Sequence, residues 1–185
     1  MKRIAIALSG LFLVTTACGV AGLPPVSGGT SAISPDPSVQ RTVAIYSAVI
    51  HQLVSNAASG RIVPVYVIDG AVDGAEDPMK PLNELRPVVA FDSAVKEGLI
   101  RALPDIKSLT FVAERSQVVV GQGPGHVIGR GVLLTVGPIH QDGASVTVGS
   151  SYWMNGLNGQ WQTYVVQERG TGWAVTGTTG PSAIS

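Results

Sequence analysis

Cys18 is the residue of this chain with the most distinctive chemistry, because cysteine occurs once and directly follows a leader-like segment. Lys2 and Arg3 give a positive start, and residues 4–14 form an apolar run that is too short to cross about 30 Å of hydrocarbon as a helix. Residues 15–17 are Thr-Thr-Ala, small residues of the kind found at a cleavage site. The pattern predicts a signal peptide over residues 1–17, cut before Cys18.

The small residues that end in Cys18 resemble the lipobox of bacterial lipoproteins. The resemblance implies cleavage on the amino side of Cys18 and diacylation of its thiol. The membrane would then be a partner, and the protein would be lipid-anchored at the cell membrane and face away from the cytoplasm. Two acyl chains anchor a protein far better than one. An ordinary secretory leader, cut after Ala17 and leaving Cys18 unmodified, is the alternative.

Serine nucleophiles are the next candidates for chemistry. A hydrolase would hold such a serine in a strained turn, with a histidine and an acid in reach. Ser145 lacks the second glycine of that motif, and Ser145, Ser150 and Ser151 all fall in predicted strands. The sequence suggests no His–Asp pairing, so no catalytic residue is assigned. The lack of a catalytic motif favours a non-enzymatic domain. A secreted hydrolase-type enzyme, with a site assembled from distant positions, is the alternative.

Ligand-binding motifs are weak throughout the chain. The glycine-rich loop 121–131 leads into a strand rather than a helix and lacks the Lys-Ser/Thr ending of phosphate loops. The acids of loop 69–77 stand at relative positions 1, 5, 8 and 9, which is not the EF-hand spacing. The histidines, which are too far apart for a zinc motif, are His51, His126 and His140. We therefore expect no metal and no cofactor.

Aromatic residues gather near the end of the chain and allow two interpretations. They can line a ligand site or an interface, or they can form the core beneath a helix. Both interpretations stay open for Trp153, Trp161, Tyr164 and Trp173.

Composition narrows the class of protein. The 185 residues carry no formal net charge, and removal of Lys2 and Arg3 with the leader leaves ten basic against twelve acidic residues. Nothing forms a basic patch, so nucleic acid is an unsuitable partner. The 45% apolar content is too high for a disordered chain.

Residues 18–35 are rich in Gly, Ser and Pro and are expected to be a flexible tether. Residues 36–185 are expected to form one domain.

The elements of that domain follow from its periodicity. Asp36-Pro37 predicts a helix start, and an apolar stripe at spacings of three and four carries the helix to about 55–56. A second helix is expected from Asp92 or Ser93 to Leu103. Residues 88–91 are expected to be either a short extended piece or the lead-in to this second helix. Extended segments are expected at 62–68, 109–113, 118–120, 132–136, 145–153, 161–168 and 173–176, with turns at 142–143 and 155–159.

The order of helix, strand, helix and then a meander predicts an α+β fold, with two helices packed on one face of a mostly antiparallel curved sheet. The tail from Gln160 to Gly177, with its Gly-Trp-x-Val strand, resembles the closing hairpin of exported cystatin-like or NTF2-like domains. The expected function is that of a membrane-anchored lipoprotein with a non-enzymatic binding or structural role in the cell envelope. Its partner would be an unknown protein or small-molecule ligand.

Overall fold

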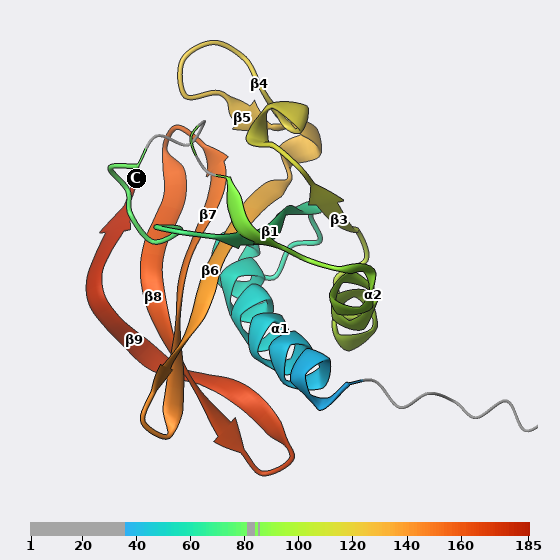
Figure 1. The fold of residues 1–185 in the computed structure, drawn as a ribbon. Helices are drawn as coiled ribbons and strands as arrows, with labels where there is room; N and C mark the ends of the chain where they lie inside the picture. The colour runs from blue at the N-terminus through green and yellow to red at the C-terminus, as the bar shows by residue number, and fades with distance from the viewer. Residues whose placement is uncertain (1–35, 81–83, 85) are drawn as a thin grey trace, which may run out of the picture. The chain divides into compact units, whose positions relative to one another are not determined.

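The computed structural model describes residues 36–80, 84 and 86–185 (Figure 1). The predictions for the signal peptide 1–17, for lipidation of Cys18 and for the tether 18–35 therefore lie outside the described residues. The contacts divide the chain between Ile33 and Ser34, so the described residues all belong to one compact unit.

The first helix, α1 (Pro37–Ala58), begins where the sequence predicts. The carboxylate of Asp36 accepts hydrogen bonds from the amide and the hydroxyl of Ser38, both at 2.7 Å, and Pro37 occupies the first helical position. The helix ends at Ser59, whose left-handed φ of 47° stops it about three residues later than expected. The stripe that the helix buries comprises Ile45, Tyr46, Val49, Ile50, Leu53, Ala57 and Ala58.

The middle of the chain alternates strands with a second helix. Strand β1 (Val65–Val72) starts just after Pro64, and α2 (Ser93–Ala102) has Asp92 as its N-cap, with a 2.8 Å hydrogen bond from the Val95 amide. The short strands are β2 (Pro87–Ala90), β3 (Leu109–Val112), β4 (Val119–Val120) and β5 (His126–Val127). Because β5 and a 3₁₀ turn (Ile128–Arg130) fall inside 121–131, the prediction of one continuous loop there is wrong.

The last third of the chain is a meander of four long strands. These are β6 (Val132–Asp142), β7 (Ser145–Asn155), β8 (Asn158–Arg169) and β9 (Gly172–Ile184). All three hairpin pairings are antiparallel, as predicted. Strands β6 and β9 run well beyond the predicted 132–136 and 173–176, because pairing with their neighbours resumes in stretches of weak apolar pattern such as 177–179.

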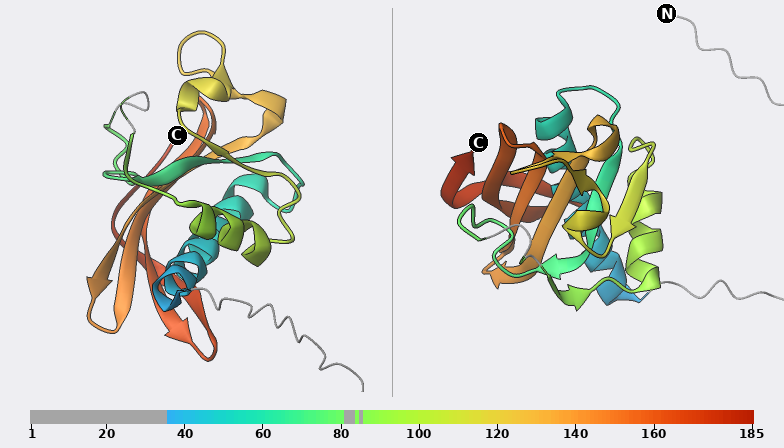
Figure 2. Two further views of the ribbon diagram at one scale, coloured as in Figure 1. Left: turned by 45° about the vertical axis from the view of Figure 1, so that its right-hand side comes forward. Right: turned by 90° about the horizontal axis from the view of Figure 1, so that it is seen from above.

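The nine strands form one unclosed sheet in which β1 pairs in parallel with β3 and β6, and the remaining pairings are antiparallel. Strands β6–β9 curve around α1, and α2 lies beside α1 (Figures 1 and 2). The predicted fold class, α+β with both helices on a mostly antiparallel sheet, is confirmed.

The sheet buries both of its faces, in two separate apolar clusters. The helix-side cluster joins the buried stripe of α1 to residues of the long strands, among them Leu134, Val148, Tyr164 and Val166. The far-side cluster lies on the opposite face of β6–β8 and contains Leu133, Trp153 and Trp161 together with apolar residues of the segment that carries β4 and β5. Alternation along each strand explains the division, because neighbouring residues point to opposite faces.

Candidate functional site

Residues of α1 line three hollows, and each hollow takes its other walls from segments distant in sequence. We name them by a residue in each: the Arg61 hollow, the Tyr46 hollow and the Trp173 hollow. Their volumes are about 250, 430 and 410 Å³. His51 lines both the Arg61 hollow and the Trp173 hollow. Polar side chains gather in the Arg61 hollow, whereas the Tyr46 hollow is the more apolar.

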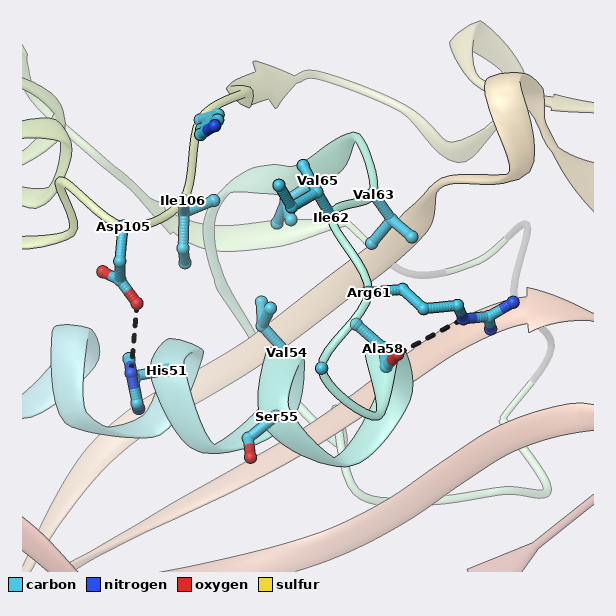
Figure 3. Close-up of a pocket in the computed structure, with 12 residues that line it drawn as sticks. His51, Val54, Ser55, Ala58, Arg61, Ile62, Val63, Val65, Asp105 and Ile106 are labelled. Carbon is cyan, nitrogen blue, oxygen red and sulfur yellow. Dashed lines mark hydrogen bonds and ion pairs between the residues drawn. The ribbon is translucent and has the colours of Figure 1, made fainter.

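The Arg61 hollow brings together the polar side chains best suited to catalysis. It lies between the second half of α1, the loop that leads into β1 and the loop after α2 (Figure 3). Nε2 of His51 lies 3.2 Å from a carboxylate oxygen of Asp105. No sequence pattern indicated this pair, because the two residues are 54 positions apart in the chain and only the packing of α2 beside α1 brings them together. Both side chains are largely exposed, 61% for His51 and 58% for Asp105.

Ser55 follows His51 by one helical turn and completes the set of residue types of a serine hydrolase. An activated serine donates a hydrogen bond of about 2.6–3.2 Å to its base. Figure 3 draws both side chains with no hydrogen bond between the Ser55 hydroxyl and the His51 ring. The His51 nitrogen that would face a nucleophile in a Ser-His-Asp triad is the one that contacts Asp105. The arrangement therefore lacks the contact that nucleophilic catalysis needs.

The Tyr46 hollow is walled by α1, by the β1–β2 pair and by the bend of β6. Its apolar walls include Val39, Val89, Phe91 and Ile139. The Tyr46 hydroxyl donates a 3.0 Å hydrogen bond to the Gly137 carbonyl, and burial raises the pKa of Tyr46 to about 12. The side chain of Tyr46 is thus neutral and already bonded. A ligand in this hollow would contact mainly apolar surface. The volume of the hollow falls in the range of about 300–1,000 Å³ typical of ligand pockets.

The four aromatic candidates lie in different environments. Trp153 and Trp161, with ring centroids 6.0 Å apart, are 6% and 7% exposed in the far-side cluster. Tyr164 is 2% exposed in the helix-side cluster, and its hydroxyl accepts a 3.0 Å hydrogen bond from Asn56. Trp173 is partly buried, packs on the helix-side cluster and lines the Trp173 hollow. Of the four rings, Trp173 is the one that the structure places beside a hollow.

Two acids of the 69–77 segment, Asp69 and Asp73, pair with lysines. Asp69 lies 3.1 Å from Nζ of Lys96, and Asp73 lies 3.9 Å from Nζ of Lys80. In residues 36–80, 84 and 86–185, no group of three or more His, Cys, Asp or Glu side chains is arranged to hold a metal ion.

The glycine-rich segment also contacts the protein rather than presenting free amides at a helix start. A guanidinium nitrogen of Arg115 donates a 2.6 Å hydrogen bond to the carbonyl of Pro124. The segment then passes through β5 and the 3₁₀ turn into β6, which is a strand, as the sequence predicts.

Comparison with known protein families, with curated proteins and with solved structures gave no match. Within the described part of the chain, no helix combines the length and apolar character needed to cross a membrane.

Proposed function

We propose that this chain is an exported, lipid-anchored envelope protein whose folded domain binds a small, largely apolar ligand without catalysis. The Tyr46 hollow carries the binding half of the proposal, because it combines a ligand-sized volume with mostly apolar walls. The leader pattern and Cys18 support the anchoring half.

The polar groups of the Tyr46 hollow favour binding over chemistry. Tyr46 is bonded to Gly137, and the Asp92 carboxylate accepts a hydrogen bond from the Val95 amide. Both groups are therefore engaged in holding the fold. Ser38 and Thr42 supply hydroxyls to the same lining. A ligand with an apolar body and one or two hydrogen-bonding groups fits this surface.

Strand β2 supplies a matched pair of variants for the binding test. Val88 and Val89 are 59% and 61% exposed, and being consecutive in a strand they point in opposite directions. Val89 lines the Tyr46 hollow, whereas Val88 is not part of its lining. With Nile red as a neutral apolar probe, Val89→Glu should weaken binding about fivefold or more, because the new carboxylate would be desolvated against the probe. Val88→Glu should leave the affinity unchanged. Equal affinities for wild type and both variants would overturn the ligand site.

The anchor is tested separately, by labelling cells that express the full chain with radioactive palmitate. We expect label on the wild-type protein, and none on a Cys18→Ala variant, which should remain an unprocessed precursor. Processing and membrane retention of Cys18→Ala at the wild-type level would overturn the lipid anchor and leave the ligand site untouched.

A secreted hydrolase is the second candidate, and the His51–Asp105 pair beside Ser55 is the observation that favours it. A fluorophosphonate probe reacts with activated serines and so tests this candidate directly. The geometry of Ser55 leads us to expect no labelling of the wild-type chain. Labelling that Ser55→Ala or His51→Ala abolishes would establish the hydrolase instead.

A further inference from the structure

The Trp173 hollow follows the edge of strand β9 rather than a face of the sheet. Its lining includes three consecutive residues of the strand, Trp173, Ala174 and Val175. A hollow over one face of a strand would contact every second residue, because successive side chains alternate between faces. A lining of consecutive residues therefore places the backbone edge of β9 along the hollow.

That edge has unused main-chain hydrogen-bonding capacity. The other edge of β9 pairs with β8, where Trp173, Ala174 and Val175 stand opposite Glu168, Gln167 and Val166. Among the described strands, β9 pairs with β8 alone. An unpaired edge presents N–H and C=O groups that can pair with another strand, and proteins often block such edges with charges or proline. Residues 172–184 carry no charge, and Pro181 lies six residues beyond Val175.

The opposite wall of the hollow is helical. It consists of Ser47, Ala48, His51 and Gln52 of α1, with Ala102 and Leu103 at the end of α2. The backbone of α1 is bonded within its own helix, so β9 is the wall that offers main-chain pairing. We propose that the Trp173 hollow binds an extended polypeptide segment, which adds a strand to the free edge of β9 and lays alternate side chains against α1 and α2.

The charges beside the hollow define the chemistry of that segment. Two exposed charges lie next to residues of the lining, although neither lines the hollow itself. The Arg41 guanidinium lies 5.1 Å from the centroid of the Trp173 ring and donates a 2.7 Å hydrogen bond to Gln141, and the Asp105 carboxylate lies 3.2 Å from His51. Arg41 and His51 are ten positions apart on α1, about 15 Å of helix, a distance that an extended chain covers in about five residues. The segment therefore carries an acidic residue for Arg41, a basic residue about five positions away for Asp105, and small or apolar residues between them.

The test begins with a random twelve-residue peptide library, displayed on phage and panned on the full-length chain in detergent. Enriched peptides should contain an acidic and a basic residue about five positions apart. Ala102 and Ala94 provide matched blocking and control variants, because both are exposed residues of α2 and Ala102 alone of the two lines the hollow. The enriched peptides are then synthesised and their affinities measured. Ala102→Arg should lower these affinities about tenfold or more, because the arginine fills the hollow, and Ala94→Arg should leave them unchanged.

Backbone pairing has its own signature in these peptides. In an added strand, every second N–H of the peptide points at the edge of β9. Two peptides are therefore compared, one N-methylated at the odd-numbered positions and the other at the even-numbered positions. Methylation should abolish binding of one of the two peptides and leave the binding of the other unchanged. Asp105→Lys should reverse the preference for a basic residue at its position. Enrichment of no peptide, binding that Ala102→Arg does not weaken, or equal binding of the two methylated peptides would each overturn the proposal. So would concentration-dependent dimerisation that Ala102→Arg abolishes, since a second copy of this chain would then be the occupant.

Discussion

The two faces of the sheet are covered by different kinds of structure. On the helix side, one 22-residue helix presents a regular apolar stripe to the long strands. On the far side, the cover comes from short pieces, namely β4, β5 and the turns around them. Long periodic elements and short irregular ones thus build two cores on the same strands.

Polar satisfaction differs between the two faces as well. On the helix side the Tyr46 and Tyr164 hydroxyls are bonded, and so is the Ser150 hydroxyl, which donates to the Gln162 carbonyl at 3.2 Å. On the far side, the buried Nε1 of Trp153 and Nε of Arg115 have no hydrogen-bond partner in the described residues. Asp69, beside α2, has one unbonded buried oxygen, but its other oxygen is paired with Lys96. Unsatisfied buried donors cost about 1–3 kcal/mol each, so we expect the far side to be the less stable face.

The largest predicted effect tests whether the far-side cluster is nevertheless a true core. Trp161→Ala should lower the free energy of unfolding by about 3–5 kcal/mol, because it removes a ring that is 7% exposed and packed on Trp153. The helix-side reference is Ile50→Ala, at a fully buried position, with an expected loss of about 2–5 kcal/mol. Urea denaturation measures both. A loss under about 1 kcal/mol for Trp161→Ala would mean that the far side is a loose cover rather than a core.

Alkaline unfolding should probe the helix side in particular. Burial raises the pKa of both Tyr46 and Tyr164 to about 12, so each stays protonated in the folded chain while the unfolded chain ionises near pH 10. The stabilisation is complete below pH 10 and is lost as pH rises from 10 to 12. Each tyrosine should contribute a fall of about 1.4 kcal/mol per pH unit in that window.

The measurement is the free energy of unfolding in urea at a series of pH values from 8 to 12. Tyr164→Phe should remove the contribution of that residue and make the fall shallower, even though it also costs the hydrogen bond to Asn56. Burial raises the pKa of Tyr152 too, in the same direction, so a residual slope should persist in the variant. An identical slope in wild type and Tyr164→Phe would contradict the assignment.

The helix-side architecture could be predicted from the sequence because its signals are local. Asp36-Pro37 and Asp92 are side-chain caps that act within three residues, and the apolar stripe of α1 repeats over six turns. On the far side, β4 falls within the extended segment expected at 118–120, but β5 was missed, because a two-residue strand has no period to detect and is held by pairing with β4 and β7. The lengths of β6 and β9 were underestimated because ladder pairing, and not side-chain pattern, extends these strands, in β9 through residues 177–179 and 183–184.

The hollows around α1 depend on long-range packing and left little trace in the sequence. His51 lies in the first helix, which the sequence predicted, but Asp105 lies beyond the second, and no local pattern connects the two residues. Alternation along β8 puts Trp161 and Tyr164 on opposite faces of the sheet, and their two clusters agree with this. The face of the sheet on which Trp173 lies depends on the register of β9 against β8. That register shifts between Val165 and Val166, and no sequence pattern predicts the shift.

Substitution of Trp173 should destabilise the fold less than substitution of Trp161. It lies on the helix side but at the margin, partly buried and stacked under Arg41. Trp173→Ala should cost about 1–2 kcal/mol, less than Trp161→Ala, because much of its ring surface is already in contact with water. Thermal melting and urea denaturation give the comparison. A loss equal to that of Trp161→Ala would show that the Trp173 hollow closes over the ring in solution.

The smallest predicted effect concerns Arg115, the cation of the far side. Its guanidinium lies 5.7 Å from the centroid of the Trp153 ring, and burial lowers its pKa while leaving Nε without a partner. Arg115→Met keeps an apolar stem over Trp153 and removes the desolvated charge, but it loses the hydrogen bond to Pro124. These terms oppose each other, so the free energy of unfolding should change by less than about 1 kcal/mol.

Amide exchange should nevertheless accelerate in the 121–125 segment, which that hydrogen bond ties to the 3₁₀ turn Arg115–Gln117. Unchanged exchange there, together with a loss above about 2 kcal/mol, would mean that Arg115 supports the far-side core itself rather than the loop above it.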